Sequence, residues 1–454
     1  MQAPILSGVR IVDGEFATSY PVNLVARAID TGVSKLQLVN AHGALTGATG
    51  PGIDRGGINW NDVLYRAMGS RLVSVSASGA ITDIGEIGND WNPASFAYSF
   101  DRLGIRSAGK LFYYNGAALS EVTDIDLGVV RDLEWIDGYF MTTDGTFIIV
   151  TELNDPTSVK PLKYGSAESD PDAITGLLKL REEMMVLGRY TVQVFQNVGG
   201  NGFPFAPFEG ATIPYGCIGP NAKCLMGDTY AFVGGGKGEP LGVFVGGQGQ
   251  ATRISTREIE DLIAAHPTPT TIEVEQRVFP GERHLIVHLD AVTLCLSVTA
   301  SQAAEEGAWT LLQSGRAAAY RPRHAVLCYG AHHVGDLGSA VVGTLTRITP
   351  DHFGAKADWQ FDAGMLFNDG MGALLNEVEL HGLFPVVESA IFFSVTFDGR
   401  QWSNEVARLI RGTLGERVLW RPGLRVPRIV GMRWRGSQRL SIARAEVQAE
   451  ALSA

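Results

Sequence analysis

The stretch from Arg71 to Gly85, RLVSVSASGAITDIG, is a run of alternating apolar residues that ends in a turn. Side chains on a β-strand point alternately to its two faces, so this pattern predicts a half-buried strand followed by a hairpin. Six segments of the same kind follow, and they begin near Lys110, Thr146, Thr191, Leu241, Thr293 and Ala340. Successive spacings are 39, 36, 45, 50, 52 and 47 residues. The chain is therefore a series of similar β-units.

A second strand and a tight turn precede most of these segments, as at residues 63–67, 139–142, 230–233 and 285–289. A hairpin cannot bury its apolar face alone, so strand pairs repeated at this spacing must pack on one another. Radial packing about an axis leaves only short, protected edges and gives a β-propeller. We expect a mainly β protein with six or seven propeller blades over residues 56–349. A large β-sandwich with irregular loops is the alternative.

The chain changes character on either side of this region. After Pro350 the predicted strands recur every 10–15 residues or so, a spacing typical of β-sandwiches. Residues 350–454 are therefore predicted to form an additional C-terminal β-sandwich-like domain with arginine-rich strands. Residues 1–55 are predicted to be an N-terminal arm or platform segment that leads into the first blade. One helix is expected, where Ser255–Glu258 matches a capping box before a short amphipathic run.

The composition excludes several classes of protein. The chain is 45% hydrophobic and 19% charged, which is too apolar for intrinsic disorder. No apolar run approaches the roughly 18 residues that span a bilayer, and the first residues lack the basic region of a signal peptide. We expect a chain made in the cytoplasm, without membrane insertion. The four cysteines form no CxxC pair and are expected to be buried thiols rather than disulfides or zinc ligands.

Charge is distributed unevenly along the chain. The net charge is −11, but the segment from Arg400 to Arg444 contains eleven arginines and two acids, a net +9, which leaves −20 for the remainder. A protein that wraps nucleic acid needs clustered cations to neutralise phosphate, so the acidic body argues against that role.

The arginines of the C-terminal segment alternate with apolar residues. This pattern predicts one cationic face and one buried face that carries Met432, Trp434, Leu440 and Ile442. Arginine with tryptophan is typical of protein interfaces. We predict an assembly contact with an acidic partner or a neighbouring subunit, with DNA phosphate or plain solvent as alternatives. The predicted partner interface comprises Arg417, Trp420, Arg421, Arg425, Arg428, Arg433, Trp434 and Arg435.

Other motifs have structural interpretations. The segments Asp144–Phe147 and Asp398–Trp402 resemble the Asp-box turn of sialidase-type propellers, in which the carboxylate binds backbone N–H groups of its own loop. The glycine-rich segment 234–239 is expected to be a hairpin turn. The histidines at 284, 288, 324, 332 and 333 are expected to be partly exposed strand residues rather than metal ligands. We therefore predict no catalytic residue, no metal and no cofactor.

Short stretches that lie in the same order along most of the chain indicate a family. They include Tyr20-Pro21-Val22-Asn23, Gly145–Thr151, Asn154-Asp155-Pro156, Asp228–Phe232, Gly247–Ala251, Glu282–Leu289 and Arg417–Trp420. Together they resemble the packaged-DNA stabilisation proteins, or tail hub (nozzle) proteins, of short-tailed bacteriophages.

The resemblance implies a structural component of the virion that is assembled in the host cytoplasm. Six copies are expected to form a ring below the portal–adaptor ring, which retains packaged double-stranded DNA and then conducts it. Docking of tail fibres or tailspikes and of a distal plug or needle is also implied. A conduit should not bind DNA tightly, so we expect an acidic and neutral channel lining. The alternatives are a propeller enzyme acting on glycans, which needs two carboxylates flanking a cleft, and a carbohydrate-binding module.

Overall fold

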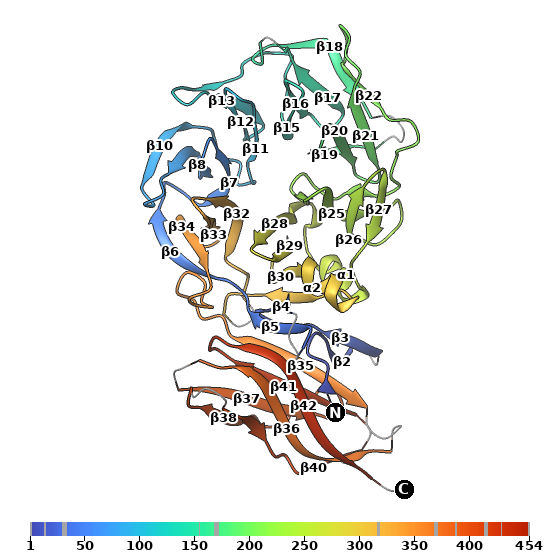
Figure 1. Ribbon diagram of the computed structural model, residues 1–454. Helices are drawn as coiled ribbons and strands as arrows, with labels where there is room; N and C mark the ends of the chain where they lie inside the picture. The colour runs from blue at the N-terminus through green and yellow to red at the C-terminus, as the bar shows by residue number, and fades with distance from the viewer. Residues whose placement is uncertain are drawn as a thin grey trace.

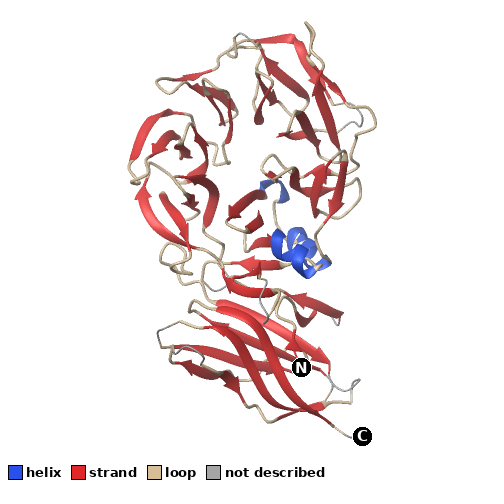
Figure 2. Ribbon diagram, viewed as in Figure 1, coloured by secondary structure: helices blue, strands red, loops and turns tan. Residues whose placement is uncertain are grey.

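The structure is a computed structural model that describes residues 2–12, 15–29, 34–153, 155–167, 172–315, 318–366, 371–385, 388–412, 416–427 and 429–452. A ring of small sheets is joined at one side to a two-layered β-body (Figure 1). Strands dominate both parts, and the helices gather where the ring approaches that body (Figure 2). Within the described ranges, no helix is long and apolar enough to cross a membrane.

Seven sheets of four or five strands surround one axis in the described part of the chain, so the predicted propeller is present and has seven blades. From the inside outward, blades 1 to 3 are β7 (Asp54–Trp60), β8 (Val63–Met68), β9 (Arg71–Val75) and β10 (Ile81–Glu86); β11 (Ser95–Tyr98), β12 (Leu103–Ser107), β13 (Lys110–Tyr114) and β14 (Leu119–Glu121); and β15 (Asp132–Ile136), β16 (Tyr139–Thr143), β17 (Phe147–Thr151) and β18 (Val159–Ser166).

Blades 4 to 6 continue the same order. They are β19 (Ile174–Leu180), β20 (Glu183–Gly188), β21 (Val192–Asn197) and β22 (Phe205–Pro207); β23 (Gly216–Cys217) and β24 (Lys223–Met226), β25 (Thr229–Gly235), β26 (Gly242–Gly247) and β27 (Gln250–Arg253); and β28 (Glu273–Phe279), β29 (Glu282–His288), β30 (Thr293–Ser297) and β31 (Trp309–Leu312). The seven segments that revealed the repeat are the third strands of the seven blades, β9, β13, β17, β21, β26, β30 and the β34 described next.

Blade 7 closes the ring with a strand from the opposite end of the propeller sequence. Its first three strands are β32 (Pro322–Cys328), β33 (Ala331–Asp336) and β34 (Val341–Thr346), and its fourth is β6 (Gly43–Thr49). Residue 44 pairs with Leu345 and residue 46 with Gly343 in this antiparallel ladder. The prediction that residues 1–55 form an arm is therefore wrong for residues 43–49, because β6 completes a blade.

The second body is a β-sandwich, as predicted, but it includes N-terminal strands. One sheet runs β39 (Val418–Trp420) and β40 (Leu424–Val426), β36 (Ala373–Leu383), β42 (Ser441–Ala451), β5 (Leu36–Asn40) and β4 (Leu24–Ala28), with β1 (Gln2–Ala3) on β42. The other runs β35 (Trp359–Leu366), β41 (Ile429–Gly436), β37 (Ser389–Thr396) and β38 (Val406–Ile410). Its core includes Phe361 stacked on Trp434, with ring centroids 4.8 Å apart. About 400 residues of sequence separate β5 from its neighbour β42, which explains why the contribution of the N-terminal strands to the sandwich was not predicted.

Local details test the turn and helix predictions. Asp144 accepts hydrogen bonds from the backbone N–H groups of residues 146 and 147, both at 2.7 Å, and Asp398 accepts them from residues 400 and 401. Both Asp turns are therefore structural, as predicted. Segment 234–239 lies in the β25–β26 hairpin, and the four cysteines are free, three of them buried.

The predicted helix is α1 (Arg257–Ala264), and α2 (Val298–Ala304) and a 3-10 turn at Pro269–Thr271 are additional. The capping box is not formed. Thr256 is the N-cap and makes no side-chain cap hydrogen bond, while the Ser255 hydroxyl donates to Glu260 instead.

Residues 20–23 hold the two bodies together. The backbone of Val22 exchanges hydrogen bonds with Gln360 of β35 (2.8 and 3.1 Å), and the Asn23 N–H donates to Leu311 of β31 (2.8 Å). Asn23 is buried, and its side chain donates to the Asp358 carbonyl (2.8 Å) and accepts from the Gln313 N–H (2.9 Å). One residue thus bonds to the propeller and to the sandwich.

Asn23→Ala is expected to weaken this joint. It removes both side-chain hydrogen bonds, leaves a buried N–H without its acceptor, and places alanine at a φ of 55°. We expect a loss of about 2–4 kcal/mol in the free energy of unfolding, measured by urea denaturation. Asn23→Gly is the control, because glycine tolerates the positive φ but lacks the side-chain hydrogen bonds. It should recover only the smaller part of the stability lost in Asn23→Ala. Equal stability of Asn23→Ala and the parent chain would contradict this role.

Candidate functional site

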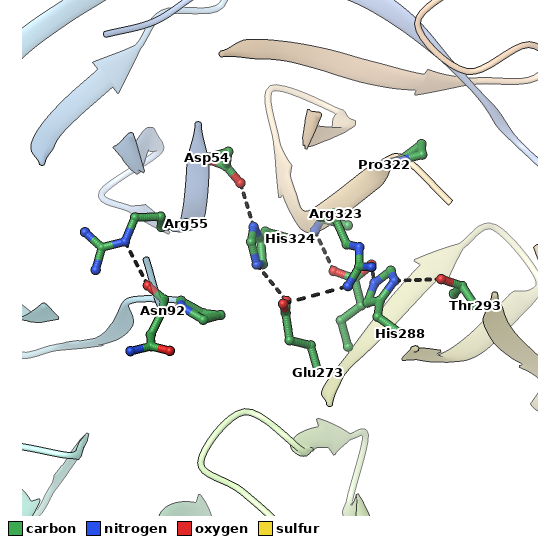
Figure 3. Close-up of polar contacts among 12 residues, drawn as sticks. Asp54, Arg55, Asn92, Glu273, His288, Thr293, Pro322, Arg323 and His324 are labelled. Carbon is green, nitrogen blue, oxygen red and sulfur yellow. Dashed lines mark hydrogen bonds and ion pairs between the residues drawn. The ribbon is translucent and has the colours of Figure 1, made fainter. Parts of the chain in front are cut away.

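The inner strands of blades 6, 7 and 1 meet in a charged cluster near the propeller axis (Figure 3). His324 of β32 lies at its centre. Its Nδ1 is 2.7 Å from an Asp54 oxygen on β7, and its Nε2 is 2.8 Å from a Glu273 oxygen on β28. Although burial disfavours the charged imidazole, the two carboxylates raise the pKa of His324 to about 10. A histidine that is protonated at neutral pH therefore links three consecutive blades.

Asp54 also binds the buried Arg66 of β8. The Arg66 Nε and Nη2 atoms donate to the two Asp54 oxygens at 2.6 and 2.7 Å, and Nη2 donates to the His324 carbonyl at 3.0 Å. Gly335 on β33 makes room for this pair, since a Cβ there would lie 2.3 Å from the Asp54 side chain. The side chain and carbonyl of His324 thus bind the last blade to the Asp54–Arg66 ion pair of the first. We refer to Asp54, Arg66, Glu273 and His324 as the closing clamp.

A second buried cluster lies beside the clamp. Glu275 pairs with Arg277, accepts a hydrogen bond from the backbone N–H of residue 325 (2.7 Å), and is 3.0 Å from His288 Nε2. Arg277 donates to the Tyr320 hydroxyl at 2.7 Å. Burial, with a smaller contribution from neighbouring cations, lowers the pKa of His288 to about 4, so this imidazole is neutral.

The structure corrects the expectation of partly exposed histidines for three of the five, while His324 and His333 are half-buried as expected. His284, His288 and His332 are buried, because they lie at the packed seam between blades 6 and 7. His42 stacks on Phe279 of β28 with ring centroids 3.8 Å apart, and burial lowers its pKa to about 3. Within the described ranges, no group of three or more His, Cys, Asp or Glu side chains could hold a metal ion.

A cavity of about 310 Å³ lies at the axis and is lined by the inner strands. Among its carboxylates, Asp132 pairs with Lys223 (2.8 Å), while Glu273 and Glu275 pair with the cations already described. Burial and the neighbouring Asp132 raise the pKa of Glu134 to about 8. The carboxylates of Asp132, Glu273 and Glu275 are thus each neutralised by an adjacent cation and stabilise the ring.

Removing the clamp's charge is expected to destabilise the propeller. His324→Asn keeps a residue that tolerates its φ of 52° but leaves the carboxylates of Asp54 and Glu273 without their shared cation. We expect a loss of about 3–5 kcal/mol in the free energy of unfolding, measured by urea denaturation. His381→Asn, which removes a half-exposed ion pair in the sandwich, is the control and should cost under about 1 kcal/mol. Similar losses in the two variants would contradict the clamp.

The buried histidines also set the pH of maximum stability. The neutral residues His42, His284 and His288, with folded pKa values of about 3, 4 and 4, contribute fully above the unfolded value near 6.5 and lose that contribution as pH falls. His324, with its pKa raised to about 10, contributes fully below 6.5 and loses its contribution as pH rises through 10.

The melting temperature is therefore expected to be highest near pH 6.5 and to fall toward pH 4.5 and toward pH 10. Differential scanning calorimetry over this range measures the profile. In His324→Asn the slope on the alkaline side should be reduced while the acid side is kept. A profile that is flat from pH 5 to 9 in the parent chain would contradict these protonation states.

The predicted interface residues divide into two groups in the sandwich. Trp420 and Trp434 are buried in its core, where Trp420 Nε1 donates to the Val406 carbonyl (3.1 Å). Because the core covers both rings, neither tryptophan belongs to a partner surface. The buried face predicted around Met432, Leu440 and Ile442 is present.

Two of the predicted arginines make close contacts within the chain. Arg433 donates to both oxygens of the buried Asp362 at 2.8 Å and lies 3.7 Å over the Trp402 ring. Arg435 pairs with Glu405 and lies over Phe392. These contacts hold the sandwich sheet together.

The remaining arginines lie along one exposed side of the sandwich. Arg417 and Arg421 expose 60% and 73% of their side chains while they contact Glu377, and Arg425 on β40 is exposed. Arg428 lies outside the described residues. The adjacent strand β38, which was not predicted, adds the exposed Arg408, and Arg411 follows it. We refer to Arg408, Arg411, Arg417, Arg421 and Arg425 as the arginine edge.

The comparisons with known proteins agree with this architecture. Residues 1–349 match the family described as "Bacteriophage P22 Gp10, beta-propeller", and residues 358–450 match "Bacteriophage P22 Gp10, beta-sandwich". The chain belongs to the bacteriophage P22 Gp10 family. It is 24% identical over 472 residues to the "Tail hub protein gp10" of Salmonella phage P22, with 96% of each chain covered.

The family relationship confirms the resemblance to phage tail hub proteins and the expectation of a structural protein rather than an enzyme. The solved structures that match are more distant. The N-terminal domain of Nup159 matches at 10% identity with a TM-score of 0.42, over 72% of this chain and 99% of that one. The Pan2 WD40 domain of Neurospora crassa matches at 10% identity with a TM-score of 0.43, over 71% and 98%.

Proposed function

We propose that this chain is the hub of a short phage tail, where six copies form a ring below the portal–adaptor ring. In this role the ring retains packaged double-stranded DNA, conducts it during ejection, and docks fibres or spikes and a distal plug. The observation that carries the proposal is the match of both bodies, in order, to one family whose named relative is a tail hub protein. No reaction is part of this function.

The charge distribution supports a conduit. Outside the arginine-rich segment the chain carries a net −20, and two buried cations inside the propeller, Lys223 and Arg66, are paired with Asp132 and Asp54. A surface that repels phosphate lets a duplex slide, because each cationic contact must be broken as it passes. We propose that acidic and neutral surfaces of the propeller line the channel.

The arginine edge supports a protein interface at the sandwich. Its cations lie on or beside the short strands β38, β39 and β40, at the side of the sheets and away from the propeller joint (Figure 1). Guanidinium groups bind carboxylates through paired hydrogen bonds, and the acidic propeller of a neighbouring copy or an adaptor offers such carboxylates. The interface proposed here is thus made of exposed arginines and excludes the two tryptophans.

Assembly of the purified chain tests both statements. We expect mass photometry to detect a six-copy ring, either alone or when the chain is mixed with its adaptor. Arg421→Glu with Arg425→Glu should weaken ring formation roughly 10- to 100-fold, because like charges then face each other. Arg181→Glu with Lys237→Glu, an equal charge change at exposed propeller positions, is the matched control.

A chain that joins no ring under any of these conditions would contradict the hub function. Equal assembly of the arginine-edge variant and the control variant would contradict the interface and leave the hub function standing.

A further inference from the structure

A cavity of about 370 Å³ opens where the propeller meets the sandwich. Its walls come from β4, β5, β36, β42 and the segment after β34. Three arginines line it, Arg27, Arg347 and Arg439, and no acidic side chain is among its described lining residues. We refer to this cavity as the joint pocket.

Arg27 and Arg347 are held in place by a buried carboxylate. The buried Glu282 accepts from Arg27 Nε at 2.7 Å and from Arg347 Nη2 at 2.8 Å, both on the same oxygen. Arg347 Nε donates to His42 Nε2 at 3.0 Å, and His42 is fixed by its stack on Phe279. The side chains of Arg27 and Arg347 are nevertheless 33% and 40% exposed, so both guanidiniums can be reached by a ligand.

The joint pocket therefore combines positive charge with apolar surface. Three guanidiniums around one buried carboxylate leave a surplus of two positive charges. Arg439 is exposed at the rim. The apolar lining includes Val39, Pro350 and Leu383, and 68% of the Leu383 side chain is exposed. A matching ligand presents an apolar side chain beside two carboxylates.

This chain carries such a group elsewhere on its surface. The turn Asp124-Ile125-Asp126 connects β14 to β15, on the half of the propeller away from the sandwich (Figure 1). The Ile125 side chain is 92% exposed. Asp124 accepts hydrogen bonds from the Asp126 and Val159 N–H groups, both at 2.9 Å, so the turn is already ordered.

We propose that the joint pocket of one copy receives the 124–126 turn of a second copy. Ile125 would lie against the apolar lining, and the carboxylates of Asp124 and Asp126 would face Arg439 and Arg347. A pocket at one end and its ligand at the other make a head-to-tail contact, which closes into a ring when the rotation between copies divides evenly. This inference rests on the ring of the proposed function and identifies one of its contacts.

Cross-linking tests the contact. In Ile125→Cys with Leu383→Cys, a short bis-maleimide should link neighbouring copies of the assembled ring into a ladder on a denaturing gel. Background is low, since three of the four native cysteines are buried and the fourth is half-buried. Phe100→Cys with Leu383→Cys is the matched control, because Phe100 is equally exposed on the same half of the propeller but lies beside the Asp101–Arg102 ion pair.

A ladder from the 125/383 pair alone supports the proposal. A ring that forms and gives no ladder, or equal ladders in both pairs, overturns the proposed contact and leaves the hub function standing. The absence of any ring overturns both.

A charge exchange provides a second measurement that does not depend on cysteine reactivity. Arg439→Glu and Asp126→Arg should each weaken ring formation roughly tenfold in mass photometry, and their combination should restore most of the loss. A double variant whose loss of ring formation equals the sum of the two single losses would contradict the pairing.

Discussion

Closure of the propeller is the constraint on which the rest of this structure depends. A ring of seven blades has one seam where the first and last blades must be joined, and here two separate interactions join them. The strand β6 completes blade 7 from the N-terminal side, and the closing clamp binds β7, β28 and β32 through one protonated histidine. The clamp is buried, so its ion pairs stabilise the ring only while each charge has its partner.

The N-terminal segment extends this constraint to the sandwich. Within the described residues before position 50, the chain contributes β1, β4 and β5 to the sandwich, bonds Val22 and Asn23 to both bodies, and then enters blade 7 as β6. The sandwich is therefore fastened to the same seam that closes the propeller. A stiff two-body unit of this kind suits a component that must hold its shape in a ring, as the proposed hub function requires.

Sequence periodicity predicted the propeller because the third strand of every blade carries buried apolar residues at a regular spacing along the chain. It did not reveal the role of residues 1–55, because β5 and β6 pair with strands about 300 to 400 residues away and no local pattern encodes such pairing. His284, His288 and His332 were predicted to be partly exposed but are buried, for a related reason. Alternation along β29 shows which residues share a face, but blade-on-blade packing buries both faces there.

Local sequence patterns were equally unable to reveal the distant partners of the arginine-rich segment. Its alternation correctly separated a buried face from a polar one, yet it could not show that Asp362 and Glu405 already bind Arg433 and Arg435. Those partners lie on other strands of the sandwich or beside them. Of the arginines predicted to meet a partner, the described ones that remain exposed lie near the short strands β39 and β40, so the proposed interface is narrower than the sequence suggested and adds Arg408 and Arg411 beside β38.

Hydrogen–deuterium exchange of the β6 amides tests the central claim most directly. If β6 is an integral strand of the closed ring, residues 43–49 will be protected as strongly as β34, and His324→Asn will raise their exchange rate together with that of β7. Fast exchange of β6 in the parent chain, with β34 still protected, would show that the N-terminal segment does not close the propeller.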